Sequence, residues 1–380
     1  RKTSRIIEAR YETPYLAHVP LEPGNCSVRL GAEGCDVWVP TQDQSGARET
    51  VAELAGLPQD AVRIHTTFVG GGFGRRLEQD VVAEAVEVAK AVGGSVHLVW
   101  SLNDEIAHDF YRPANMNLLR AAVDAQGNPT AWFQRTAGPT LSLGSDIPYA
   151  IPHLREEQVE VNPGIPTGAW RSVAASQNAF AVECFVDELA HAAGVDPLEY
   201  RLRLLAGAPR HRAVLEAAAE RAGWGAPLST GRARGVAVYR SYGGWVAEVA
   251  EVSVAALGAV QVHRIVCAAD CGTVVNPDGV IAQMEGSVVF GLTAALKGEI
   301  TFEAGRAMQH GFDDYPLLTF AETPDIEVVL MPSRAVPGGA GEPGVPPVAP
   351  AVANAIFAAS GRRLRRLPLH DAVRPFERMR

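Results

Sequence analysis

The sequence predicts an α+β fold in which mixed sheets pack against helices in two subdomains. Short β-rich runs alternate with amphipathic helix patterns, and hydrophobic residues make up 47% of the 380 residues, enough for a sizeable core. Residues 140–166 are rich in Pro and Gly and lack helix signals, which sets a soft boundary near Pro163. We therefore expect one subdomain over residues 1–163 and a second over residues 164–380.

Charge and cysteine content argue against several classes of protein. The chain has 43 acidic and 34 basic residues and a net charge of −9, which argues against nucleic acid as the main partner. Its five cysteines include no C-x-x-C pair, so we expect buried thiols and no zinc ribbon or iron–sulfur cluster within this chain. Cys26 and Cys35 could pair in an oxidising compartment or stay reduced against a core. No run approaches the roughly 18 apolar residues of a membrane span, and cytoplasmic and periplasmic locations both remain open.

The first strand and helix patterns enclose a polar loop. An extended segment at 12–23 is followed by strand patterns at 25–30 and 35–39, which a Gly-Ala-Glu-Gly turn joins as a hairpin. A helix pattern spans residues 46–55. Gln42, in a Pro-Thr-Gln motif, therefore lies in a strand-to-helix loop, where an amide either donates to a bound oxygen or, more commonly, closes the loop.

A glycine-rich loop follows. A strand pattern at 62–69, the loop Gly70–Arg76 and a helix pattern at 77–92 form a strand–loop–helix unit, whose backbone N–H groups suit an anionic or oxo group. The loop does not read G-x-G-x-x-G, because no glycine stands where the third one belongs, so a nicotinamide dinucleotide site is not expected. The alternative is a packing loop in which Arg75 and Arg76 are solvated.

The middle of the chain contains a polar cluster before a hairpin. A strand pattern at 95–101 is followed by His108, Asp109, Tyr111 and Arg112, for which we expect solvated or satisfied core groups rather than a metal site. Strand patterns at 116–123 and 131–137 then form a hairpin.

Helix patterns dominate the next stretch. A long one spans 174–193, a second opens at Asp196-Pro197, and a third spans 210–222. Arg171 lies just before the first of them. A guanidinium is unfavourable beside the positive end of a helix dipole, so we expect Arg171 to serve an anion or a carboxylate, with an ordinary surface arginine as the alternative.

The last part of the chain returns to strands and ends on helix patterns. A hairpin at 245–254 and 260–269 leads into a helix that begins near Pro277 and contains Gln283, and a strand pattern follows at 326–331. A helix at 350–359 closes at Gly361, and we expect the Arg-rich tail at 362–366 to be a solvated basic end.

Glu342 is the candidate catalytic residue. It lies in the loop 338–347, among glycines that permit close backbone approach and prolines that fix the turn. A carboxylate held in such a loop has the fixed position that a general base needs. A Gly/Pro loop on its own is more often a simple strand-to-helix turn with a solvated glutamate, so the rest of the chain must decide.

Six ordered motifs resemble those of the molybdopterin-binding large subunit of the xanthine oxidase family of molybdenum hydroxylases. The closest likeness is to the isoquinoline 1-oxidoreductase beta subunit and its aldehyde dehydrogenase relatives. The motifs are P-T-Q at 40–42, G-G-G-F-G-R-R at 70–76, W-R at 170–171, D-C-G-T-V-V-N-P from 270, A-Q-M-E-G from 282 and G-A-G-E-P-G-V-P-P from 339. The resemblance runs from about Glu12 to Leu367.

The resemblance implies a role for each matching residue. Glu342 would be the glutamate that deprotonates a Mo–OH group, so that its oxygen attacks an electron-poor carbon while hydride passes to a Mo=S sulfur. Gln42 resembles the glutamine bonded to a molybdenum oxo ligand, and Arg171 an arginine near the cofactor. The remaining cofactor-binding candidates are Gly71, Gly72, Phe73 and Gly74 of the glycine loop, Gln283 on the dinucleotide side, and Gly341.

The resemblance also implies a cofactor and partners. The cofactor would be molybdopterin cytosine dinucleotide, with molybdenum held by the pterin dithiolene and no protein metal ligand. The family subunit is about twice as long, and its amino-terminal half contains an M-G-Q-G loop that is absent here. We therefore expect a carboxy-terminal half that needs an amino-terminal half or companion chain, and that binds no cofactor without it. An iron–sulfur subunit would accept the electrons.

Two readings of function follow from the resemblance. Purine-oxidising members have a glutamate where this chain has Leu77, so an aldehyde or an N-heteroaromatic compound, hydroxylated with oxygen from water, is the expected substrate. The alternative is a non-catalytic scaffold or assembly module of such a complex.

Overall fold

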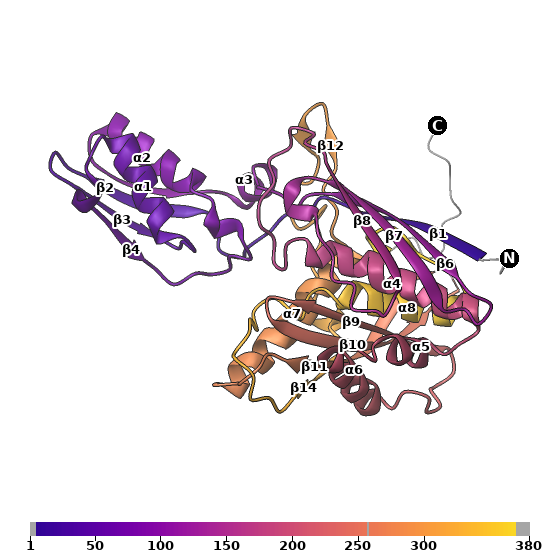
Figure 1. Cartoon of the computed structure of the whole chain (residues 1–380). Helices are drawn as coiled ribbons and strands as arrows, with labels where there is room; N and C mark the ends of the chain where they lie inside the picture. Colours follow the sequence, from indigo (N-terminus) through magenta and orange to yellow (C-terminus); the bar gives the residue numbers. More distant parts are fainter. Residues whose placement is uncertain (1–4, 257, 370–380) are drawn as a thin grey trace.

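The computed structural model describes residues 5–256 and 258–369, and it confirms the α+β prediction. Within these residues it has three four-stranded sheets, a two-stranded ribbon and eight α-helices. Figure 1 shows one sheet with two helices set apart from two larger sheets that enclose a helical layer. The site described below lies where these parts meet.

The first unit is a sheet covered by helices on one face. Its strands are β2 (Asn25–Leu30), β3 (Cys35–Val39), β4 (Val62–Thr66) and β5 (Ser95–Val99), in the order β4-β3-β2-β5, and its helices are α1 (Gln44–Ala55) and α2 (Asp80–Val92). Alternate strand residues, including Cys26, Val28, Cys35 and Val37, pack against the buried valines and alanines of both helices. Cys26 and Cys35 are free thiols in this core, as are the other three cysteines in theirs. The hairpin expected from the sequence is therefore confirmed, and it forms the centre of the unit.

The second sheet joins distant parts of the chain. Its order is β1-β6-β7-β8, formed by β1 (Arg5–Thr13), β6 (Asn115–Val123), β7 (Pro129–Gly138) and β8 (His153–Glu160). The hairpin of β6 and β7 confirms the prediction, whereas β1 pairs with β6 across more than a hundred residues. A short helix, α3 (Leu102–Ala107), precedes β6.

The third sheet forms the far side of the main core. Its order is β14-β11-β10-β9, formed by β9 (Arg232–Ser241), β10 (Gly244–Val254), β11 (Val260–Asp270) and β14 (Asp325–Leu330). The helices α5 (Pro197–Leu204) and α6 (Pro209–Ala222) lie beside it, and β12 (Phe302–Glu303) and β13 (Arg306–Ala307) form a separate ribbon.

Two helices form the layer between the larger sheets (Figure 1). They are α4 (Ala175–Ala193) and α8 (Val348–Ser360). Residues 176–190 of α4 are all buried, because the helix packs against β1 and β6 on one side and β9 on the other. Its buried Glu183 is satisfied by Arg201 and by the Tyr149 hydroxyl. The position of the subdomain boundary near Pro163, between β8 and α4, stays a proposal.

The helix α7 (Pro277–Leu296) corrects the expectation that no run approaches a membrane span. By length and composition alone it is apolar enough to cross a membrane. From Met284 onward it packs in the main core through Met284, Val288 and Leu292. Core helices pass the same test, so this is weak evidence for a span.

Other differences have local causes. The strand expected at 62–69 ends at Thr66, and the helix expected at 77–92 begins only at Asp80, because a short 3₁₀ turn at 75–77 precedes it. The Arg-rich tail is not simply solvated: Arg365 forms a bidentate pair with Glu188 of α4, and Arg363 pairs with Asp187.

Candidate active site

The glycine loop is pressed against the segment before α4. Gly74 has φ 109°, and a Cβ there would lie 1.4 Å from the Ala169 carbonyl oxygen, so no side chain fits. Gly70 N–H donates to Glu22 Oε2 at 2.6 Å. The next three N–H groups, of Gly71, Gly72 and Phe73, form no hydrogen bond with any residue that the structure describes. The loop is thus fixed at both ends and keeps three donors for a ligand.

The two arginines after the loop are buried, so the alternative of solvated arginines is wrong. Arg75 forms a bidentate pair with Asp80 and lies 3.2 Å from Asp109, which also accepts from His18. Arg76 pairs with Glu105 at 3.2 Å. These ion pairs hold the end of the loop against the start of α2 and against α3 and the segment after it.

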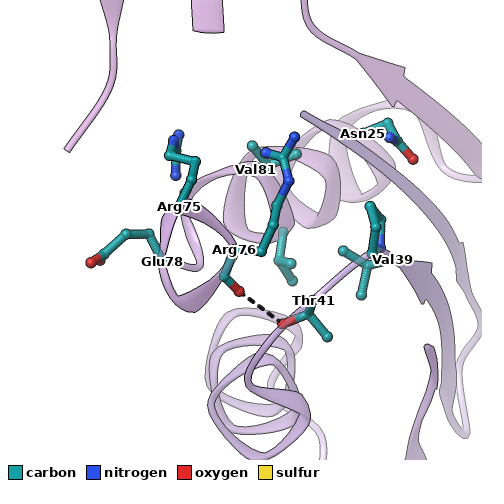
Figure 2. Close-up of a pocket in the computed structure, with 9 residues that line it drawn as sticks. Asn25, Val39, Thr41, Arg75, Arg76, Glu78 and Val81 are labelled. Carbon is teal, nitrogen blue, oxygen red and sulfur yellow. Dashed lines mark hydrogen bonds between the residues drawn. The ribbon is translucent and has the colours of Figure 1, made fainter. Parts of the chain in front are cut away.

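The same turn fixes the Pro-Thr-Gln motif. Thr41 Oγ1 donates to the Arg76 carbonyl oxygen, as Figure 2 shows, and Gln42 N–H donates to that oxygen at 2.9 Å. Figure 2 also shows Arg75 and Arg76 pointing away from this contact. The strand-to-helix loop predicted for Gln42 is therefore tied directly to the glycine loop.

Gln42 lies over the glycine loop with an exposed side chain. Its Oε1 accepts from Gly74 N–H at 3.2 Å and would be 2.4 Å from a Cβ at Gly72. Its Nε2 donates to no residue in the described part of the chain. The amide therefore both closes the loop and keeps a donor, which combines the two alternatives left open by the sequence.

An aromatic stack connects the glycine loop with the core. Phe73, held at φ 55°, packs on Phe290 of α7 with ring centroids 4.7 Å apart, and Phe290 stacks on Trp170 at 4.5 Å. The Arg112 guanidinium lies 5.1 Å from the Trp170 ring. Arg112 is fully buried, and burial lowers its pKa to about 9. A buried cation thus lies at the inner end of this stack.

Arg171 joins three segments at the outer side of the stack. Its Nε donates to the Gly341 carbonyl at 2.7 Å, and its Nη2 donates to Gln283 Oε1 at 2.9 Å. Its guanidinium also lies over the Phe290 ring. Burial lowers the pKa of Arg171, and the Glu342 carboxylate opposes that effect. The arginine binds carbonyl oxygens directly and faces a carboxylate.

Glu342 is held by its neighbours and is only half-buried. Ser172 N–H donates to its Oε2 at 2.8 Å, and Ser172 Oγ donates to its carbonyl oxygen at 2.7 Å. Burial, together with the charge of the Glu342 carboxylate, raises the pKa of Tyr242 to about 12. The carboxylate is therefore fixed, and it remains within reach of a small molecule.

The structure brings all the predicted site residues into one continuous set of contacts. Gln42 touches the glycine loop, Phe73 of that loop touches Phe290, and Arg171 connects Phe290 with Gly341 and Gln283. Sequence reasoning missed four participants: Ser172, Phe290, Tyr242 and Arg112, the last noted only as part of a polar cluster. Among residues 5–256 and 258–369, no group of three or more His, Cys, Asp or Glu could hold a metal ion.

Comparisons with known proteins bear on this arrangement. A family model described as molybdopterin cofactor-binding domain matches residues 1–205, and a second with the same description matches residues 155–324. The chain is 29% identical to isoquinoline 1-oxidoreductase subunit beta of Brevundimonas diminuta, over 100% of this chain and 52% of that protein. It is 31% identical to the membrane-bound aldehyde dehydrogenase [pyrroloquinoline-quinone] of Gluconacetobacter polyoxogenes, over 97% of this chain and 53% of that protein. The chain thus spans about half the length of these curated relatives.

A solved structure has the same fold. Quinoline 2-oxidoreductase from Pseudomonas putida 86 superposes with a TM-score of 0.85 at 15% identity, over 97% of this chain and 76% of that one.

Proposed function

The chain belongs to the molybdopterin cofactor-binding domain family, within the xanthine oxidase family of molybdenum hydroxylases, and we propose that it forms the base-carrying half of such an enzyme. The observation that carries the proposal is Glu342, which Ser172 holds through both its carboxylate and its carbonyl, next to Gly341 held by Arg171. A restrained carboxylate that Arg171 and Phe290 connect to a loop with unpaired donors suits a base near a bound anionic group.

The residues present fit the cofactor. The three unpaired N–H groups of the glycine loop and the free Nε2 of Gln42 are donors for oxo or other anionic atoms. Gln283, exposed on α7, and Arg171 add polar groups at the other end of the stack. When bound, the cofactor supplies the redox chemistry of hydroxylation, with oxygen from water. We propose molybdopterin cytosine dinucleotide as its form.

The chain's own contribution is proton transfer and positioning. Glu342 accepts a proton at a carboxylate oxygen, and the Ser172 N–H at Oε2 restricts where that oxygen can point. Arg171 keeps Gly341, and with it the loop, against α7. Phe73 and Phe290 form an apolar wall beside the donors.

The substrate we propose is an N-heteroaromatic compound or an aldehyde. Two of the similar proteins are named for isoquinoline and quinoline, and one for aldehydes. Leu77 is partly exposed just after the glycine loop, where it offers an apolar contact instead of a carboxylate. An apolar ring or alkyl group matches that contact better than a purine does.

The partners we propose follow from the length of the relatives. The chain covers 52% of one relative and 53% of another, so a further large-subunit part, on the same or another chain, would complete the cofactor site. An iron–sulfur subunit would take the electrons.

The test is Glu342→Gln in the complete molybdenum-containing complex. We expect turnover to fall by roughly 10²–10⁴-fold, the contribution of a positioned base, while molybdenum content stays constant. Glu285→Gln, an exposed glutamate on α7, is the matched control and should leave turnover unchanged. Undiminished turnover in the Glu342 variant would refute the role.

A second measurement separates the enzyme from a non-catalytic scaffold. Molybdenum and cytosine dinucleotide are quantified in the purified chain, alone and together with the completing part. Cofactor bound only in the presence of the completing part supports the proposal. Cofactor that never binds favours the scaffold.

A further inference from the structure

A buried histidine lies where the glycine loop meets the segment before α4. The side chain of His18 is fully buried. Its Nδ1 lies 2.9 Å and 3.1 Å from the two carboxylate oxygens of Asp109. Its Nε2 lies 2.9 Å from the carbonyl oxygen of Ala169. Each ring nitrogen therefore faces an oxygen at hydrogen-bond distance.

These oxygens require both ring nitrogens of His18 to donate. A carbonyl oxygen only accepts, and so does an ionised carboxylate. The Asp109 carboxylate also accepts from the His18 backbone N–H at 2.6 Å and lies 3.2 Å from Arg75 Nε, so donors face both of its oxygens. A neutral imidazole has one N–H, whereas an imidazolium has two. His18 therefore fits its site as a cation.

The charged groups around the ring come from several elements. Asp109 follows α3, Arg75 belongs to the turn after the glycine loop, and Glu78 stands just before α2. Glu105 of α3 lies 3.7 Å from Arg75 Nε. Burial alone would raise the pKa of Asp109, and the charges of His18 and Arg75 outweigh it and lower that pKa. Asp109 is thus an anion between two cations.

The Ala169 carbonyl is also the group against which the glycine loop packs. A Cβ at Gly74 would lie 1.4 Å from this oxygen and 3.3 Å from His18 Nε2. Ser172, three residues after Ala169, donates its N–H to Glu342 at 2.8 Å. His18 therefore contacts the point where the glycine loop and the segment that restrains Glu342 come together.

The backbone is strained in all three segments that meet there. The φ angles are 46° at Val19, 55° at Phe73, 78° at Ser172 and 45° at Val173. These are four of the six non-glycine residues with positive φ in the part of the chain that the structure describes. Valine is especially unfavourable in this region because it is β-branched. Such strain persists only where the surroundings hold it, and it gathers at binding and active sites.

We propose that His18 is a positioning residue for this site: as an imidazolium anchored on Asp109, it holds the Ala169 carbonyl against the glycine loop. The donors of the loop and the Ser172 N–H that restrains Glu342 are thereby kept at a fixed separation. The role rests on the proposed function of Glu342, since this separation matters only where a base and a cofactor share the site.

A first experiment measures the charge of His18 in the purified wild-type chain. Long-range proton–nitrogen NMR correlation of the deuterated protein reports on both ring nitrogens of each histidine. We expect both His18 nitrogens to carry a proton at neutral pH. One protonated and one bare nitrogen would overturn the proposal, and the function proposed for Glu342 would still stand.

A second experiment follows the link to Glu342 in the same chain by amide hydrogen exchange. Ser172 N–H donates to Glu342, and Val173 N–H donates to the Trp170 carbonyl at 2.6 Å, so both amides should be protected. Their exchange, corrected for its intrinsic dependence on pH, should accelerate at the pH where the His18 ring loses its second proton. Unchanged protection once that proton is lost would overturn the proposal.

Two variants separate the contacts of His18 in the complete molybdenum-containing complex. His18→Asn places an amide donor near the Nδ1 position, which faces Asp109, whereas His18→Gln places it near the Nε2 position, which faces Ala169. Per bound molybdenum, kcat should fall about 10–100-fold in His18→Asn and stay within about threefold of wild type in His18→Gln. His97→Asn, at an exposed histidine of β5, is the matched control and should leave kcat unchanged.

The outcomes distinguish this role from that of the base. An equal loss of kcat in the two His18 variants would overturn the proposal. Full kcat in His18→Asn together with a loss in Glu342→Gln would refute the positioning role alone. Undiminished turnover in Glu342→Gln would instead refute the function on which the proposal rests.

Discussion

Arg112→Met is expected to stabilise the chain, because Arg112 is a buried cation without an anionic partner. Its guanidinium is 1% exposed, Nε has no hydrogen-bond partner, and in the described part of the chain no carboxylate lies within ion-pair distance. Burial lowers its pKa from the usual 12.5 to about 9. At about 1.4 kcal/mol per pKa unit, the charge costs the folded state about 5 kcal/mol.

Two favourable contacts are lost in the same substitution. Arg112 Nη2 donates to the Pro14 carbonyl at 3.1 Å, and the guanidinium lies over Trp170. A hydrogen bond to a charged group contributes about 2 kcal/mol and a cation–π contact about 1 kcal/mol. Methionine keeps most of the volume, so the free energy of unfolding should rise by about 1–3 kcal/mol near neutral pH.

Urea unfolding across a pH series measures both the size and the sign of this change in the free energy of unfolding. The folded-state pKa lies below the unfolded one, so the cost is present in full below pH 9 and shrinks as pH rises through that value. The difference between Arg112→Met and wild type should therefore narrow above about pH 9. Arg120→Met, at an exposed pair with Glu8, is the control and should change stability by less than about 0.5 kcal/mol. A variant less stable than wild type, or a difference independent of pH, would refute the reasoning.

Three further predictions concern the glycine loop, the core and a surface pair. Gly74→Ala should lower the free energy of unfolding by about 2–4 kcal/mol in urea, because its Cβ meets the Ala169 carbonyl, whereas Gly93→Ala, with open space around it, should cost only about 1 kcal/mol. Glu183→Gln leaves Arg201 incompletely paired in the core, and thermal and urea unfolding should show a loss of about 3–5 kcal/mol; a loss below 1 would contradict this. Lys297 lowers the pKa of Glu322 to about 2, so the contribution of Glu322 should be complete above about pH 5 and vanish toward pH 2. Acid unfolding of Glu322→Gln should lack the loss of stability that protonation of Glu322 causes in the wild type.

Local periodicity predicted the elements whose partners are near in sequence. The hairpins β2–β3, β6–β7 and β10–β11 have short connections, so each strand pattern lies next in sequence to that of its partner. The strand β8 was missed because it is exposed on both faces and pairs parallel to β7, which leaves no alternation to read. The strand β1 was missed, because β6, its partner, is far along the sequence; the extended segment expected at 12–23 overlaps it only at Glu12 and Thr13.

The site residues, too, could be predicted where the signal is local in sequence and not where it depends on distant segments. Gln42, the glycine loop and Glu342 could be found because each lies in a compact motif with its own backbone requirement. Phe290 reads as one of many apolar positions in α7, and only the packing of three distant segments makes it the connection between Phe73 and Arg171. The tail arginines were expected to be solvated, and that was wrong for Arg365 because Glu188 comes close only after α4 is buried.

The completing part that we propose would matter more for the cofactor than for Glu342. From the sequence, Glu342 could lie in a loop that only a companion part of the enzyme would order. Here Ser172 holds both the carboxylate and the carbonyl of Glu342, and Arg171 holds Gly341. These contacts come entirely from this chain, so the position of the proposed base does not depend on contacts from a partner. In the described part of the chain, three N–H donors of the glycine loop and the Nε2 of Gln42 have no hydrogen-bond partner. We therefore propose that a completing part would cover the donors and retain the cofactor, and that it would not be needed to order the loop 338–347.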